Sequence, residues 1–138
     1  TVDGWLLKDE KKNQVRILTE AEAKRFGGRG GDEEPKRIRT KYEPIATDGR
    51  FTLLKVTLLT GRSHQIRVQM AGKGHPLLGD KKYGTKESIE ASRELGIKRQ
   101  MLHAGLLSFP AFEEGFEGVS GKSFRAPLPE DMEKLIQK

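Results

Sequence analysis

The chain of 138 residues contains no cysteine. Disulfide bonds and thiolate chemistry are therefore excluded, and a cysteine-free chain fits the cytoplasmic location that we expect without establishing it. No apolar run approaches the ~20 residues that a membrane-spanning helix requires, and no signal-peptide pattern is present. The first residue is Thr1 rather than methionine, so we expect the sequence to be a trimmed piece of a longer protein.

Residue spacing excludes two common kinds of functional site. The three histidines lie far apart on different predicted elements with no His-x-x-x-His pair, so no zinc site is expected from them, even together with Asp80. Gly121-Lys122-Ser123 resembles the end of a phosphate-binding loop, but Phe116 stands where that pattern requires glycine. We therefore expect neither a metal nor a bound nucleotide.

The net charge of +6 fits an acidic partner, most simply a nucleic acid, although charge alone supports this only weakly. For any single basic residue, an ordinary charged surface is the better explanation. Taken together, the basic residues predict a salt-sensitive and weakly sequence-specific affinity for RNA. The candidate RNA-facing residues are Lys36, Arg37, Arg39, Lys41, Lys73, Lys81, Lys82 and Lys86.

Hydrophobic periodicity in the first half predicts an antiparallel sheet. Strands are expected at 5–7, 15–18, 38–42 and 51–59. In the third strand, Ile38, Thr40 and Tyr42 alternate with basic residues, which gives a half-exposed strand with a basic outer face. Asp48-Gly49 predicts the hairpin turn into the fourth strand. The glycine-rich stretch 26–35 is expected to be a mobile loop.

The second half adds helices to this sheet. The pattern predicts a short helix ending near Gly72, a solvent-facing helix at 86–95 and a terminal helix that begins at Pro129. Residues 101–109 are interpreted as a buried strand, and 113–121 as a hairpin or loop. The fold class is therefore α+β, with a mixed, mainly antiparallel sheet flanked by a few helices.

Residues 60–67 read Thr-Gly-Arg-Ser-His-Gln-Ile-Arg and form the most informative segment. A strand, a glycine turn and a helix start predict that Arg62, Ser63 and Arg67 surround one helix N-terminus, which favours an anion. Ser63 is interpreted as the helix N-cap rather than a nucleophile. His64 is expected to form hydrogen bonds at the helix start. Ile66 and Met70 are expected to share a separate helix face.

Several alternatives remain open at this level. Arg62 fits either a contact to an RNA phosphate or a turn residue that binds local carbonyl groups. Spacing alone favours Arg67 as a solvated surface arginine. Tyr42 and Tyr83 fit either base stacking or the core.

Several motifs in register resemble a known family. Segment 60–67 is followed by Gly-His-Pro-Leu-Leu-Gly-Asp at 74–80, Tyr-Gly at 83–84, Leu-His-Ala at 102–104 and Phe-Arg-Ala-Pro at 124–127. Their order and spacing closely resemble the C-terminal half of the RluA-type RNA pseudouridine synthases, which modify mainly ribosomal RNA. The opening Gly-Trp-Leu-Leu-Lys-Asp-Glu-Lys at 4–11 is also similar, so the resemblance covers nearly the whole chain.

The resemblance implies that uridine within RNA is isomerised to pseudouridine without a metal or organic cofactor. In that family the catalytic residue is an aspartate of a His-Arg-Leu-Asp motif, a tyrosine lies in a later strand, and the arginine matching Arg67 pairs with the aspartate. Neither that motif nor that strand occurs here. The resemblance thus implies that 1–138 is the C-terminal portion of a catalytic domain, whose missing N-terminal half is its partner. This portion alone is expected to be inactive.

Two further consequences and two alternatives accompany this interpretation. A sheet edge exposed where the N-terminal half is missing is a pairing hazard, so we expect self-association or loss of order near Thr1. The alternatives are a non-catalytic RNA-binding module and an unrelated basic scaffold that binds protein. An upstream His-Arg-Leu-Asp in the same reading frame would favour the enzyme, whereas a flat, mixed-charge surface around Arg67 would favour the scaffold.

Overall fold

The computed structural model describes residues 1–9, 14–25, 34–108 and 121–136, which fall into two compact units, Thr1–Gln100 and Met101–Lys138. The elements of the first unit are β1 (Val2–Asp9), β2 (Gln14–Leu18), α1 (Glu20–Arg25), β3 (Lys36–Thr47), β4 (Thr52–Leu58), α2 (Gln65–Gly72) and α3 (Lys86–Glu94). Those of the second unit are β5 (Leu106–Ser108), β6 (Ser123–Arg125) and α4 (Glu130–Ile136). The predicted α+β class is confirmed.

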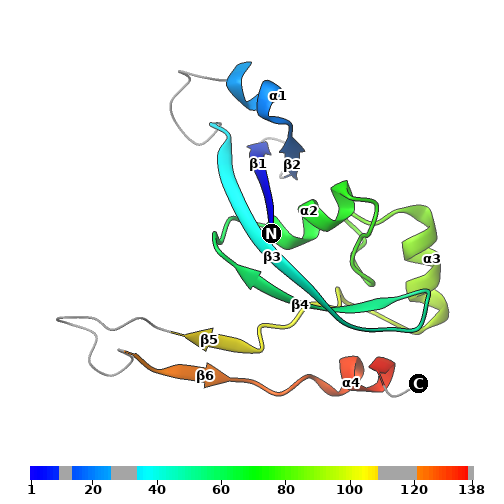
Figure 1. Cartoon of the computed structure of the whole chain (residues 1–138). Helices are drawn as coiled ribbons and strands as arrows, with labels where there is room; N and C mark the ends of the chain where they lie inside the picture. The colour runs from blue at the N-terminus through cyan, green and yellow to red at the C-terminus, as the bar shows by residue number, and fades with distance from the viewer. Residues whose placement is uncertain (10–13, 26–33, 109–120, 137–138) are drawn as a thin grey trace. The chain divides into compact units, whose positions relative to one another are not determined.

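The first unit contains a four-stranded sheet in the order β2-β1-β3-β4, and every neighbouring pair is antiparallel (Figure 1). The predicted hairpin between β3 and β4 is confirmed. Its turn is held by Asp48, whose Oδ1 accepts the N–H groups of Arg50 at 2.8 Å and Phe51 at 2.7 Å. Gly49 supplies the positive φ of 89° that this turn needs.

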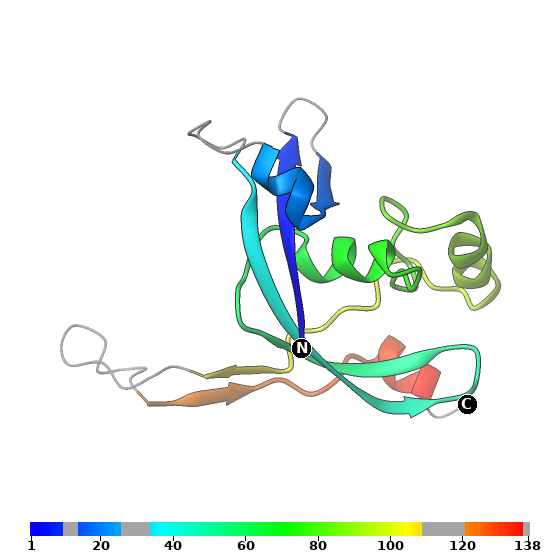
Figure 2. The same ribbon diagram turned by 45° about the horizontal axis from the view of Figure 1, so that its top comes forward.

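One face of the sheet forms the core with α2. The alternation predicted for β3 is confirmed, since Ile38 and Thr40 are both fully buried while the basic residues that alternate with them, Arg37, Arg39 and Lys41, are exposed. Leu6 and Val15 join Ile38 on this face, and Val68 contributes from α2. Figure 2 shows α2 beside β1 and β3. The core therefore fixes α2 against the sheet.

The buried face of α2 is largely polar. It carries Gln65 and Gln69 beside Val68, and both glutamines are at most 4% exposed. The Thr40 hydroxyl donates to Oε1 of Gln69 at 2.6 Å and accepts a hydrogen bond from Nε2 of Gln65 at 2.8 Å. Tyr42 donates its hydroxyl to the same Oε1 at 2.6 Å. These satisfied amides join the helix to β3.

The predicted apolar helix face at Ile66 and Met70 is not the one that α2 buries, because both side chains are only partly buried. The spacing of apolar residues in a sequence predicts only an apolar buried face. In α2 the contact to β3 is made by two glutamines, and their hydrogen bonds compensate for the cost of burying their polar groups. A polar core contact of this kind leaves no apolar signal in the sequence.

The strand predicted at 101–109 is shorter and more exposed than expected. Among the described residues of this segment, Leu106–Ser108 forms a strand that pairs with β6, and Leu106 and Leu107 are 50% and 58% exposed. The prediction of a buried strand was therefore wrong, because a two-stranded ribbon leaves its faces uncovered. Residue 109 lies outside the described residues.

The helices of the structure agree with those predicted from the sequence, with one exception. The solvent-facing helix and the terminal helix correspond to α3 and α4, and both are confirmed. Helix α1 was not predicted. Its signal is a capping box, in which Thr19 accepts the N–H of Glu22 at 3.2 Å and Glu22 accepts the N–H of Thr19 at 3.0 Å. In the described part of the chain, no helix has the length and apolar character that crossing a bilayer requires.

Parts of the expected loops lie outside the described residues. These are 26–33 of the stretch expected to be mobile, 113–120 of the second glycine-rich segment, and 10–13 of the turn between the first two strands. The remainder of that turn, Lys8 and Asp9, belongs to β1.

We predict that Thr40→Val lowers the free energy of unfolding by about 1–3 kcal/mol, since the variant removes hydrogen bonds to both buried glutamines. Urea unfolding followed by circular dichroism measures the effect. Thr57→Val, on the exposed side of neighbouring β4, is the matched control and should change little. Equal losses in the two variants would show that the amide network contributes nothing specific.

Candidate functional site

Arg67 lies in the first turn of α2 and forms a bidentate ion pair with Asp80, which follows Gly79 in the next loop. Nε of Arg67 donates to Oδ2 at 2.9 Å, and Nη2 donates to Oδ1 at 2.9 Å. The Arg67 side chain is 15% exposed and that of Asp80 is 0% exposed. Arg67 is therefore not a fully solvated surface arginine, and its two-pronged contact with the buried carboxylate is a strong kind of ion pair.

The Asp80 carboxylate is held from a second side by the backbone. Oδ1 also accepts the N–H groups of Lys82 at 3.1 Å and Tyr83 at 3.2 Å. Burial is the largest influence and raises the pKa of Asp80. The hydrogen bonds from Arg67, Tyr83 and Lys82, with the Arg67 charge, outweigh it and place the pKa below its usual range. The carboxyl thus stays ionised and fixed.

Tyr83 and His64 complete the surroundings of the ion pair. The Arg67 guanidinium lies 5.0 Å from the centre of the Tyr83 ring, and the Tyr83 oxygen lies 2.7 Å from Nδ1 of His64. The Val15 N–H also donates to that oxygen, at 3.3 Å. The predicted hydrogen bonding of His64 at the helix start is confirmed.

His64 adopts a left-handed backbone conformation, with φ of 56°. A non-glycine residue in this region is strained, and such strain is found at functional sites. Burial lowers the pKa of His64, and so do the charges of Arg67 and Lys82, while Asp80 opposes them in part. The imidazole is therefore a neutral hydrogen-bonding group at neutral pH.

The start of α2 differs from the predicted capping by Ser63. His64 is the N-cap residue and makes no side-chain capping bond. The Gln65 side chain holds the turn instead, since its Oε1 accepts the Arg62 N–H at 3.0 Å and the Thr60 hydroxyl at 2.9 Å. The interpretation of Ser63 as N-cap was wrong, because a buried glutamine at the start of the helix supplies the acceptor.

The structure does not bring all predicted site residues together. Arg67 lies in the buried cluster, whereas Arg62 and Ser63 are exposed. Both interpretations of Arg62 thus remain predictions.

The basic residues predicted to face RNA divide into two groups. On β3, carboxylates pair with Lys36 (to Glu34, 4.0 Å), Arg39 (to Asp3, 2.6 Å) and Lys41 (to Glu43, 3.8 Å). The structure shows no ion pair within the described residues for Arg37, Lys73, Lys81 or Lys86. The ammonium of Lys82 lies 5.8 Å from the centre of the Tyr83 ring. The basic face of β3 is therefore partly neutralised.

Among the described residues, no group of three His, Cys, Asp or Glu side chains is arranged to hold a metal ion. Asp80, which the sequence analysis weighed only as a metal ligand, has its carboxylate oxygens engaged by Arg67 and two backbone amides. The partnership with Arg67 was missed because the two residues lie thirteen positions apart in the chain. The only sequence signal was the Gly-Asp pair shortly before Tyr-Gly.

Comparisons with a family profile and with individual proteins all point to RNA pseudouridine synthases. The profile of the family described as RNA pseudouridylate synthase matches residues 5–72. The uncharacterized RNA pseudouridine synthase YlyB of Bacillus subtilis is 36% identical over 137 residues, covering 99% of this chain and 38% of that protein. Ribosomal large subunit pseudouridine synthase C of Haemophilus influenzae is 39% identical over 137 residues, with the same coverage. The chain spans less than two fifths of the length of these relatives.

We predict that Asp80→Asn lowers the free energy of unfolding at pH 7 by about 3 kcal/mol, because it leaves the partly buried Arg67 charge without a counter-charge. The matched control is Asp3→Asn, which breaks the exposed pair with Arg39 and should have a much smaller effect. Urea unfolding of both variants measures the difference. Equal effects would contradict the buried pair described here.

The same variants test how the free energy of unfolding depends on pH. The folded-state pKa of Asp80 is lowered, so its stabilising contribution is present above the unfolded-state pKa of about 3.9 and is lost as the pH falls through the folded value. Wild-type stability should therefore fall below about pH 4, and Asp80→Asn should remove part of that fall.

Proposed function

Because this chain belongs to the RNA pseudouridylate synthase family, we propose that it takes part in the isomerisation of uridine to pseudouridine within RNA. The glycosidic bond of the target uridine breaks, and the uracil rotates and rejoins the ribose through carbon 5. The names of ribosomal relatives support large-subunit ribosomal RNA as the substrate and a cytoplasmic location. The observation that carries the proposal is the partly buried Arg67 guanidinium, held by Asp80, within the matched segment.

The proposed role of Arg67 is to hold a second acid at the reaction centre. Asp80 engages Nε and Nη2, and no hydrogen bond to Nη1 is present within the described residues. A guanidinium fixed on one edge presents its other N–H groups in a defined direction with little reorganisation. We propose that this free edge binds the catalytic aspartate, which keeps that carboxylate ionised and oriented.

That aspartate would come from polypeptide outside 1–138. The proposal treats residues 1–138 as the C-terminal portion of the catalytic domain, in agreement with the small share of its relatives that the chain covers. The two edges of the sheet are β2 and β4. Either edge offers unpaired backbone groups to the missing portion or, without it, to a second copy of the chain.

We predict that the 138-residue chain alone releases no tritium from ribosomal RNA labelled at carbon 5 of uridine. Release should appear when the polypeptide also contains the portion with the His-Arg-Leu-Asp motif. Turnover by the chain alone would refute the assignment of the catalytic acid. Binding of RNA without turnover, even with that portion present, would favour the non-catalytic RNA-binding module.

Within that active polypeptide, Arg67→Ala should lower turnover by at least about a hundredfold while RNA affinity changes little. Arg67→Lys, which retains the charge but loses the fork, should also be impaired. The matched control is Arg16→Ala, at an exposed position of β2, which should retain activity. Circular dichroism checks that each variant is folded, and unchanged turnover in folded Arg67→Ala would contradict the proposed role.

A further inference from the structure

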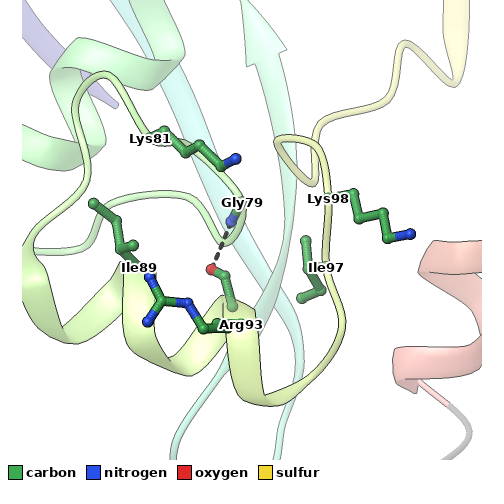
Figure 3. A pocket seen from close by; sticks show the side chains of 7 residues that line it. Gly79, Lys81, Ile89, Arg93, Ile97 and Lys98 are labelled. Atoms are coloured by element: carbon green, nitrogen blue, oxygen red, sulfur yellow. Dashed lines mark hydrogen bonds between the residues drawn. The ribbon is translucent and has the colours of Figure 1, made fainter.

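A hollow of about 330 Å³ lies between the loop at Gly79, α3 and the segment that follows α3 (Figure 3). Its apolar lining comes from Ile89 and Ile97, and the charged lining residues are Lys81, Arg93 and Lys98. The volume falls within the range of about 300–1,000 Å³ that is usual for ligand sites. Three separate chain segments thus each contribute a basic residue to the lining, and Figure 3 shows the Arg93 guanidinium beside Ile89 and the Lys98 side chain extending away from it.

The charge of this hollow is not compensated. No carboxylate lines it, and within the described residues no ion pair involves Lys81, Arg93 or Lys98. The neighbouring carboxylate of Glu94 is directed to Arg50, at 3.5 Å. This contrasts with the basic residues of β3, where Arg39 and Lys41 have carboxylate partners. The hollow is therefore better suited to an anion than the basic strand is.

The walls of the hollow are held by specific contacts. The Gly79 N–H donates to Oγ of Ser92 at 2.8 Å, and that hydroxyl donates to the Ser88 carbonyl at 2.6 Å. Gly79 has φ of 80°, and a Cβ there would lie 1.8 Å from the Arg99 carbonyl oxygen. Only glycine permits this close approach of the two segments. A ligand would thus meet a pre-formed surface, which reduces the ordering penalty of binding.

The hollow is joined to the Arg67 site through one loop. Asp80 directs its carboxylate to Arg67, while its two chain neighbours, Gly79 and Lys81, line the hollow. Residues 79–81 therefore contribute both to the Arg67 ion pair and to the wall of the hollow.

We propose that this hollow binds the sugar–phosphate backbone of the RNA strand that flanks the target nucleotide. Phosphate oxygens pair with Lys81, Arg93 and Lys98, and the apolar faces of ribose contact Ile89 and Ile97. Contacts to the backbone position an RNA strand without reading its sequence. This assignment rests on the proposed function, since it takes RNA as the substrate. Arg93 and Lys98 were not among the basic residues predicted to face RNA.

The test compares two triple variants of the chain. Lys81→Gln/Arg93→Gln/Lys98→Gln removes the charges of the hollow. The matched control, Lys24→Gln/Lys55→Gln/Lys134→Gln, removes three exposed charges elsewhere. Fluorescence anisotropy measures the binding of a labelled hairpin of large-subunit ribosomal RNA between 50 and 200 mM salt, approximately the range where phosphate contacts dominate.

The hollow variant should bind at least about tenfold more weakly, and its salt dependence should be shallower by about two to three in the slope of log K against log salt, roughly one for each phosphate that is no longer neutralised. The control should stay within about threefold of wild type. A charge-retaining variant, Lys81→Arg/Arg93→Lys/Lys98→Arg, should retain most of the affinity. Thermal unfolding shows whether each variant is folded.

Each contrary result has a distinct meaning. Equal loss of affinity in the hollow and control variants would overturn the hollow as a site and leave only non-specific charge. If the hollow variant binds RNA as tightly as wild type, this inference is overturned but the proposed function is not. Absence of RNA binding by wild type would count against both. Binding of polyglutamate at the hollow as tightly as RNA would indicate a protein partner and overturn the assignment.

Discussion

The buried ion pair between Arg67 and Asp80 is the interaction on which the rest of the site depends. It joins α2 to the following loop, and that loop brings Tyr83 against both the guanidinium and His64. Two buried charges are tolerated only because the fork and the backbone amides satisfy the carboxylate. The pair therefore stabilises little by itself, but it fixes the direction in which Arg67 presents its remaining N–H groups.

A second polar contact places this pair relative to the sheet. Gln65 and Gln69 bind Thr40 on the central part of β3, so the rotation of α2 is set by directional hydrogen bonds rather than by apolar packing alone. Any rotation of the helix that moved Arg67 would also leave buried amides unsatisfied. The basic hollow extends the arrangement on the other side of the Asp80 loop, so one loop connects the proposed reaction centre with the proposed binding surface for RNA.

The sequence was sufficient for features that depend on local pattern. The alternation around Ile38, the turn at Asp48-Gly49 and the octapeptide at 60–67 predicted β3, its hairpin and α2. Features that depend on tertiary contacts were missed: the polar face of α2, the partnership of Asp80 with Arg67, and the exposure of Leu106. In each case the chemistry of a residue was visible, but its neighbour across the fold was not. Arg67 was identified through motif resemblance, because spacing alone favoured a surface arginine.

The central claim is that Arg67 and Asp80 act as one coupled unit. A double-mutant cycle of Arg67→Lys and Asp80→Asn, measured as the free energy of unfolding of the chain at pH 7, tests it most directly. The account predicts a coupling free energy of about 2 kcal/mol or more between the two positions. Additive effects of the two substitutions, with a coupling near zero, would contradict it.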